Sequence, residues 1–126
     1  MTHKDNFIHS ELTNLILKAY YKVYNELGYG LTKEDYINAL DFELRLSAGQ
    51  FEINKKINLF YSNQIIGRFE VDLIWTEKVI VQVTSNSVLK QDDLDKLPTL
   101  MKHSKTQVGL LLNFGINPEH KRRVLN

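Results

Sequence analysis

The chain has 126 residues, of which 43% are hydrophobic and 25% charged, a composition typical of a soluble globular domain. It contains no cysteine, which excludes disulfide bonds, thiolate metal ligands and a cysteine nucleophile. Its net charge of +1 gives no global attraction to nucleic acid, so any such binding would need a local basic patch. We expect one cytoplasmic domain over residues 1–126, with a flexible tail at residues 1–10 and no membrane segment.

The first periodic segment, from about Glu11 to Leu27, predicts a helix. Its apolar residues recur three and four positions apart, as they do on one face of a helix. Ser10 is expected to cap the beginning, and Gly28 to end the helix in a left-handed conformation. The residues on this face are Leu12, Leu15, Ile16, Ala19, Tyr20, Val23 and Leu27.

A second helix is predicted to begin after Thr32, which is a favourable N-cap residue. Glu34 and Asp35 fall in its first turn, where acidic side chains suit the positive end of the helix dipole. Gly49 is expected to close this segment. The face of the helix continues through Tyr36, Ala39, Leu40, Glu43 and Leu44.

Three strands are predicted between residues 51 and 84. Residues 51–61 alternate between apolar and polar side chains, with Lys55 as the one polar break in the apolar row. Residues 78–84 are largely apolar, as in a central strand covered on both sides. Between them, residues 67–75 predict a strand with Phe69, Val71, Leu73 and Trp75 on one face and Arg68, Glu70, Asp72 and Ile74 on the other.

The last third of the chain predicts a helix, a strand and a basic end. Residues 90–103 have a helical apolar face, but Pro98 is expected to kink or split the helix. Residues 107–113 predict a final buried strand, and the chain from Pro118 on is interpreted as a short basic helix or tail. The order α, α, β, β, β, α, β predicts an α/β fold with a mixed central sheet flanked by helices.

Several segments resemble the small bacterial family known as GxxExxY proteins, of the PD-(D/E)XK (restriction-endonuclease-like) nuclease superfamily. The resemblance covers nearly the whole chain and implies an αβββαβ core preceded by an extra N-terminal helix. The segments that carry it are Asn25–Leu31 (NELGYGL), Asp72–Ile74 (DLI), Lys78–Val81 (KVIV), Val108–Gly115 (VGLLLNFG) and Lys121–Asn126 (KRRVLN).

The resemblance implies a metal-dependent catalytic centre. Active members hold Mg²⁺ with an Asp on one strand and a Glu on the next, and a Lys two residues later supports the attacking water or the phosphate. Here the Asp is present as Asp72, but the Glu position holds Gln82 and the Lys position holds Thr84. The centre is therefore expected to be degenerate, with Asp72 and Gln82 as metal ligands only if it is active. If only the charge pattern is missing, Gln82→Glu with Thr84→Lys should create a Mn²⁺ site.

Charged residues near this centre could either oppose metal binding or substitute for its missing side chains. The Glu of the GxxExxY motif aligns with Lys33, beside Glu34, and a lysine at that position would repel a metal. Glu70 lies two residues before Asp72 and is expected to face the same side of the strand, so it could supply the missing acid. Lys96 or Lys33 could reach the pocket in place of the missing lysine. The simpler interpretation of Glu70 is a solvated strand residue.

The leading interpretation is a catalytically inactive nuclease-like domain that acts by binding nucleic acid or a protein partner, including a second copy of itself. Such a domain needs no cofactor. The alternative is an active nuclease that depends on Mg²⁺ or Mn²⁺ and uses Asp72 with Glu70 or Gln82. Basic residues that could contact phosphates cluster at Lys55–Lys56 and Lys121–Arg123, although a solvated surface is the simpler interpretation. Tyr20, Tyr21 and Tyr24 are interpreted as core and rim residues, or in part as a dimer face.

Overall fold

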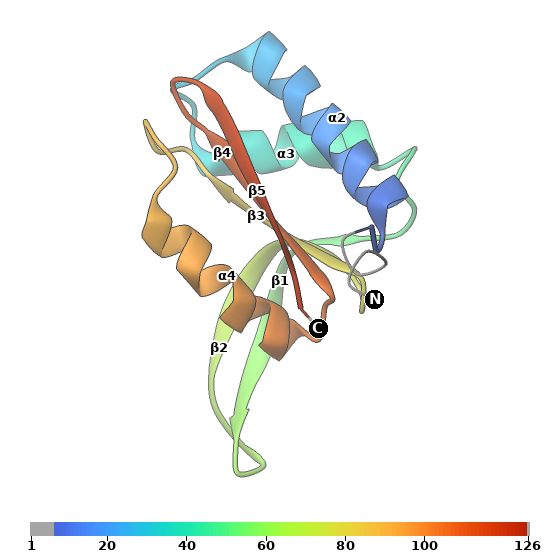
Figure 1. Ribbon diagram of the computed structural model, residues 1–126, viewed down its shortest axis with the longest axis vertical. Helices are drawn as coiled ribbons and strands as arrows, with labels where there is room; N and C mark the ends of the chain where they lie inside the picture. The colour runs from blue at the N-terminus through green and yellow to red at the C-terminus, as the bar shows by residue number, and fades with distance from the viewer. Residues whose placement is uncertain (1–6, 126) are drawn as a thin grey trace.

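Three helices and five strands make up the computed structural model, which describes residues 7–125 (Figure 1). The helices and strands follow the predicted order, with one strand added at the end. In chain order they are α2 (Ser10–Leu27), α3 (Lys33–Leu44), β1 (Glu52–Tyr61), β2 (Gln64–Trp75), β3 (Val79–Thr84), α4 (Gln91–Ser104), β4 (Val108–Phe114) and β5 (Pro118–Val124).

The strands lie in the sheet in chain order, β1-β2-β3-β4-β5. β3 and β4 are parallel, and the other neighbours are antiparallel. Parallel neighbours need a long crossover connection, which α4 provides between β3 and β4. The mixed sheet flanked by helices is the fold class predicted from the sequence, and that prediction is confirmed.

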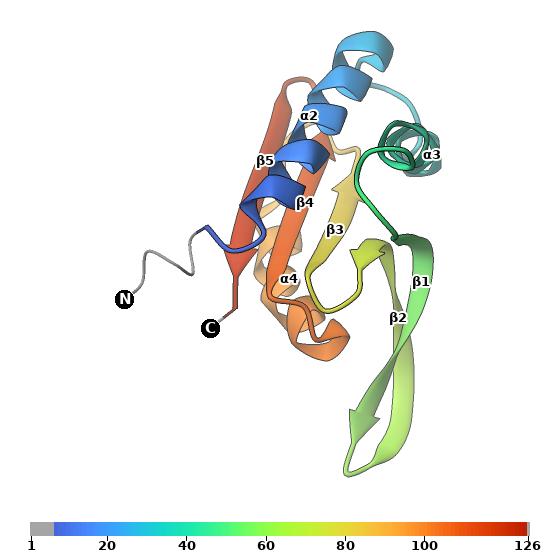
Figure 2. The ribbon, with the colours of Figure 1, turned by 90° about the vertical axis from the view of Figure 1, so that its right-hand side faces the viewer.

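Helices cover both faces of the sheet, with α2 and α3 on one side and α4 on the other (Figure 2). Most of the predicted apolar faces of the helices are buried against β3 and β4, which are apolar on both sides because both sides are covered. Leu15 and Leu27, predicted on the apolar face of the first helix, are exposed instead. The α2/α3-side core includes Ile16, Tyr20, Ile37, Leu40, Leu73, Val81 and Leu110. The α4-side core includes Val71, Ile74, Ile80, Leu94, Leu97, Met101 and Leu111.

Two tyrosines of α2 fasten this helix to the β4–β5 region. The Tyr20 hydroxyl donates to the carbonyl oxygens of Asn113 and Glu119 at 2.5 and 3.1 Å. The Tyr24 hydroxyl donates to the carbonyl oxygen of Gly115 at 2.7 Å. Burial raises the pKa of Tyr20 above its ordinary value, so its hydroxyl stays protonated as a donor. This agrees with the interpretation of the α2 tyrosines as core and rim residues.

The β1–β2 hairpin projects beyond the rest of the sheet (Figures 1 and 2). Its turn residues Ser62 and Asn63 have positive φ angles of 48° and 64°, as in the tight turns whose twist matches that of paired strands. Residues 57–67 contain no charged side chain. The large apolar side chains at the tip are 56–71% exposed; they are Phe60, Tyr61, Ile65 and Ile66.

Three local predictions are wrong. The segment from Pro118 to Val124 is a strand and not a helix or tail, because its backbone pairs with the otherwise open edge of β4. Of the two outcomes expected at Pro98, a kink or a split, the split is wrong, because Pro98 lies inside the single helix α4. Ser10 is the first helical residue and not the cap; the cap position is held by His9, with a left-handed φ of 55°.

The beginning of the described chain packs against the loop before β4. Residues 7–9 form a turn ahead of α2, and His9 Nε2 lies 2.6 Å from Gln107 Oε1. Residues 1–6 of the predicted tail lie outside the described residues. Among the residues that the structure describes, no helix combines the length and apolarity needed to cross a membrane.

Candidate functional site

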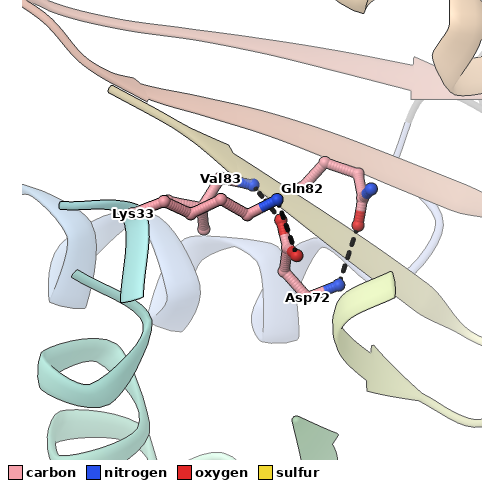
Figure 3. Close-up of polar contacts among 4 residues, drawn as sticks. All are labelled: Lys33, Asp72, Gln82 and Val83. Atoms are coloured by element: carbon pink, nitrogen blue, oxygen red, sulfur yellow. Dashed lines mark hydrogen bonds and ion pairs between the residues drawn. The ribbon is translucent and has the colours of Figure 1, made fainter. Parts of the chain in front are cut away.

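Asp72 lies where β2 and β3 separate. The backbone register of these strands ends at Leu73 opposite Val81, so the next step would place Asp72 opposite Gln82. Side chains replace the backbone ladder at this point (Figure 3). The Asp72 N–H donates to Gln82 Oε1 at 2.8 Å, and the Val83 N–H donates to Asp72 Oδ2 at 2.7 Å. Two of the residues predicted for the centre are therefore in direct contact.

Strand alternation is interrupted at the same place. Val71 and Ile74 both belong to the α4-side core, although residues three apart in a regular strand face opposite sides. On β1, Asn54 has a positive φ of 52°, and the β1–β2 register skips both Asn54 and Asp72. The prediction that Val71 shares a face with Leu73 is therefore wrong, because the local irregularity shifts the alternation by one residue.

Lys33, the first residue of α3, forms an ion pair with Asp72. A capping box at Thr32 and Asp35 fixes this turn: the Asp35 N–H donates to the Thr32 hydroxyl and the Thr32 N–H to the Asp35 carboxylate, both at 3.2 Å. Lys33 Nζ lies 3.0 Å from Asp72 Oδ1, and its side chain is 44% exposed while that of Asp72 is 1% exposed. One oxygen of Asp72 thus contacts a cation and the other accepts the Val83 N–H (Figure 3).

Burial dominates the protonation of Asp72. It raises the pKa of this carboxyl above its ordinary value, and the Val83 N–H and the Lys33 ammonium offset only part of the effect. The charge of Glu70 contributes a further repulsion in the same direction. Glu70 itself is exposed on β2.

The raised pKa predicts how stability depends on pH. The folded state binds the Asp72 proton more tightly than the unfolded state, so this stabilisation is complete below the ordinary pKa of about 4 and is lost as pH rises through the higher folded pKa. Asp72→Asn cannot titrate, but its amide oxygen can still accept the Val83 N–H. Urea denaturation should show the wild-type free energy of unfolding falling relative to that of Asp72→Asn across this window. A wild-type advantage that grows with pH would instead mean that Lys33 lowers the pKa.

Thr84, which was predicted to replace a catalytic lysine, is held by a buried asparagine. Its hydroxyl donates to Asn113 Oδ1 at 2.8 Å, and the Asn86 N–H donates to the same oxygen at 3.0 Å. Asn113 Nδ2 donates to the Asn86 carbonyl at 3.0 Å. Asn113 is fully buried in β4 and was not predicted as a site residue, although it is the one polar side chain in the segment VGLLLNF. The network ties the ends of β3 and β4 together.

Two other predicted positions do not contact Asp72. Lys96 is exposed, and its Nζ pairs with Asp92 Oδ2 on the same helix at 3.0 Å. Glu34 is exposed in the first turn of α3. The residues that meet at Asp72 are thus Lys33, Gln82 and Val83, the last through its backbone.

The side chains around Asp72 do not fit a divalent metal. Mg²⁺ and Mn²⁺ prefer negatively charged oxygen ligands. Here the single carboxylate is paired with an ammonium, and the Gln82 oxygen is neutral and already accepts an N–H. Across residues 7–125, no three side chains of His, Cys, Asp or Glu come together in a way that could hold a metal ion.

Comparisons with known proteins identify a family at the level of the whole domain. The family model described as the PD-(D/E)XK nuclease superfamily matches residues 10–124. This range covers every helix and strand from α2 to β5. No curated protein and no solved structure matches the chain.

Proposed function

This chain belongs to the PD-(D/E)XK nuclease superfamily, and we propose that it is a member that binds nucleic acid without cutting it. Membership in a superfamily of nucleases supports nucleic acid as the class of ligand. The observation that carries the loss of cleavage is the ion pair between Lys33 and Asp72.

Lys33 occupies the place where a metal would have to bind. Its ammonium lies 3.0 Å from Asp72 Oδ1 and supplies the positive charge that a buried carboxylate needs. A divalent cation could reach this oxygen only by displacing the lysine, and the nearby positive charge opposes its approach. Lys33 therefore neutralises the Asp72 carboxylate, as a metal ion would, but supplies none of a metal's chemistry.

The side chains at the other two positions of the centre, Gln82 and Thr84, also form hydrogen bonds within the fold. Gln82 keeps an oxygen at the Glu position, and this oxygen accepts the Asp72 N–H. Thr84, at the Lys position, bonds to Asn113 and presents no cation to a phosphate. The finer resemblance to the GxxExxY proteins belongs to this proposal, because Lys33 then stands where that motif has its Glu. We infer a degenerate centre in which all three positions now stabilise the fold.

A protein partner, including a second copy of this chain, is a second candidate. The apolar tip of the β1–β2 hairpin favours it: Phe60, Tyr61, Ile65 and Ile66 are more than half exposed on an uncharged segment. Exposed apolar clusters of this kind mark interaction sites more often than isolated apolar residues do. An active nuclease that recruits Glu70 has less support, because Lys33 would still neutralise Asp72.

A cleavage assay combined with a binding assay tests the proposal. Purified protein is incubated with labelled single- and double-stranded DNA and RNA, with Mg²⁺, with Mn²⁺ and with a chelator. We expect complexes in all three conditions and intact nucleic acid throughout, with Asp72→Ala behaving as the wild type does. Metal-dependent cleavage that disappears in Asp72→Ala would establish the active nuclease instead. Failure to bind any of these nucleic acids would leave the protein partner as the function.

A further inference from the structure

The charge of this chain is distributed unevenly along its length. Residues 96–126 hold six basic residues and one acidic residue, a net charge of +5. Residues 1–95 hold ten basic and fourteen acidic residues, a net charge of −4. The net charge of +1 is therefore the sum of an acidic part and a basic C-terminal quarter. This quarter contains the C-terminal part of α4 and the whole of β4 and β5.

Two of these basic residues face the α4 side of the sheet from β5. Lys121 is paired with Leu111 and Arg123 with Gly109 in the β4–β5 register. Partners across two strands share a face. Leu111 lies in the α4-side core, and a Cβ on Gly109 would meet Met101 of α4 at 2.7 Å, so both β4 residues face α4. Lys121 and Arg123 are therefore exposed alongside α4.

Three further lysines lie at the end of the sheet where α4 stops and β4 begins. Lys102 is in the last turn of α4, and Lys105 ends this helix with a left-handed φ of 59°. The Lys78 carbonyl accepts the N–H groups of Gln107 and Val108 at 3.2 and 3.0 Å, which sets the β2–β3 turn beside the loop after Lys105. Figures 1 and 2 show the end of α4, the start of β4 and the C-terminal part of β5 at the same end of the molecule.

All five side chains are exposed, and among the described residues none of them makes an ion pair. Two acidic residues lie near these cations in the sequence: Glu77 precedes Lys78, and Glu119 lies two residues before Lys121 on β5, where its carboxylate accepts the Leu89 N–H. Lys102 also suits the negative end of the α4 dipole. Lys121 and Arg123 lie on a strand, where no such dipole accounts for their charge.

We propose that this surface, formed by Lys78, Lys102, Lys105, Lys121 and Arg123, is where the protein holds the phosphate backbone of nucleic acid. This inference rests on the proposed function and adds where on the protein the nucleic acid binds. Unpaired cations spread over a helix end, a turn and a strand match a ligand with several phosphates, and such contacts are strengthened by the release of counterions. Lys33, which pairs with Asp72, comes from α3 on the opposite side of the sheet. Bound nucleic acid would therefore lie away from the degenerate centre.

Charge reversal with a matched control tests this location. Lys102→Glu/Lys121→Glu changes two exposed lysines of the surface. Lys18→Glu/Lys90→Glu makes the same change in charge at two exposed lysines, one on α2 and one before the other end of α4. A short labelled DNA duplex is titrated with full-length protein, and fluorescence anisotropy is recorded between about 50 and 200 mM salt. Circular dichroism and thermal unfolding confirm that every variant is folded.

We expect five phosphate contacts to give the wild type a slope of about −4 to −5 for log K against log salt. The surface variant should bind at least about tenfold more weakly at low salt, with a slope smaller by about 2, while the control binds as the wild type does.

Equal losses of affinity in both variants would show that only overall charge matters and would overturn the location. If the surface variant binds as tightly as the wild type, the proposed location is wrong, but the proposed function stands. A wild type that binds no nucleic acid would overturn both. Lys78→Gln/Lys105→Gln, which adds no negative charge, should show a smaller loss in the same direction.

Discussion

Replacing Asn113 with leucine is expected to lower the free energy of unfolding by about 2–4 kcal/mol. The Asn113 side chain is fully buried and bonds to the Thr84 hydroxyl, the Asn86 N–H and the Asn86 carbonyl. Leucine has a similar size but would leave these groups without partners. Each buried polar group left unsatisfied costs about 1–3 kcal/mol, and the half-buried Thr84 can recover part of its loss through water.

Urea denaturation measures this loss, and Thr84→Val provides the control. Valine removes the single bond from position 84 and leaves the two bonds between Asn113 and Asn86, so a loss of about 1 kcal/mol is expected. Equal losses for Asn113→Leu and Thr84→Val would mean that Asn86 finds water readily and that Asn113 does not organise this end of the sheet.

The same network explains why a lysine would be difficult to accommodate at position 84. Thr84 is short, and its hydroxyl reaches Asn113 on the neighbouring parallel strand. A lysine at this position would lose that bond and would need to extend out of a region where Asn113 is fully buried. Replacement at position 84 therefore disturbs the junction of β3 and β4, whereas replacement at position 82 changes a residue that is only half-buried.

Periodicity was sufficient to predict most of the fold, because the elements that carry it are buried on defined faces. The helices covering residues 10–27 and 33–44 and the apolar strands β3 and β4 lie close to their predicted positions. β5 was missed because the sequence HKRR has no apolar alternation. It becomes a strand only by pairing with β4, a contact that local sequence does not encode.

The proximity of Asp72 and Gln82 could be predicted from the sequence, but the bonds that surround them could not. Spacing placed Asp72 and Gln82 on adjacent strands, and the structure brings them into contact. The ion pair with Lys33 depends on how the first turn of α3 docks beside these strands, and the burial of Asp72 depends on a local break in strand alternation. Neither follows from residue spacing. The sequence predicted only that Lys33 would repel a metal from nearby. In the structure its ammonium contacts the Asp72 carboxylate directly.

Because Lys33 occupies that carboxylate, creating a metal site should require its removal as well as a second acid. We expect Lys33→Ala/Gln82→Glu to bind Mn²⁺ at least about tenfold more tightly than Gln82→Glu alone. In the single variant the ammonium 3.0 Å from Asp72 Oδ1 still opposes the metal. A unit charge about 4 Å away contributes about 4 kcal/mol at an effective dielectric constant near 20. The partial exposure of Lys33 reduces this, and tenfold corresponds to about 1.4 kcal/mol.

Isothermal titration calorimetry with Mn²⁺ measures the affinities, and thermal unfolding with and without Mn²⁺ shows whether the ion stabilises each fold. Lys33→Ala alone is the matched control: it leaves one buried carboxylate without its cation, so it should lose stability and still bind Mn²⁺ weakly or not at all. If Gln82→Glu alone binds Mn²⁺ as tightly as the double variant, Lys33 is not the obstacle. The missing acid would then be the sole defect, and the ammonium would be a replaceable neighbour of Asp72.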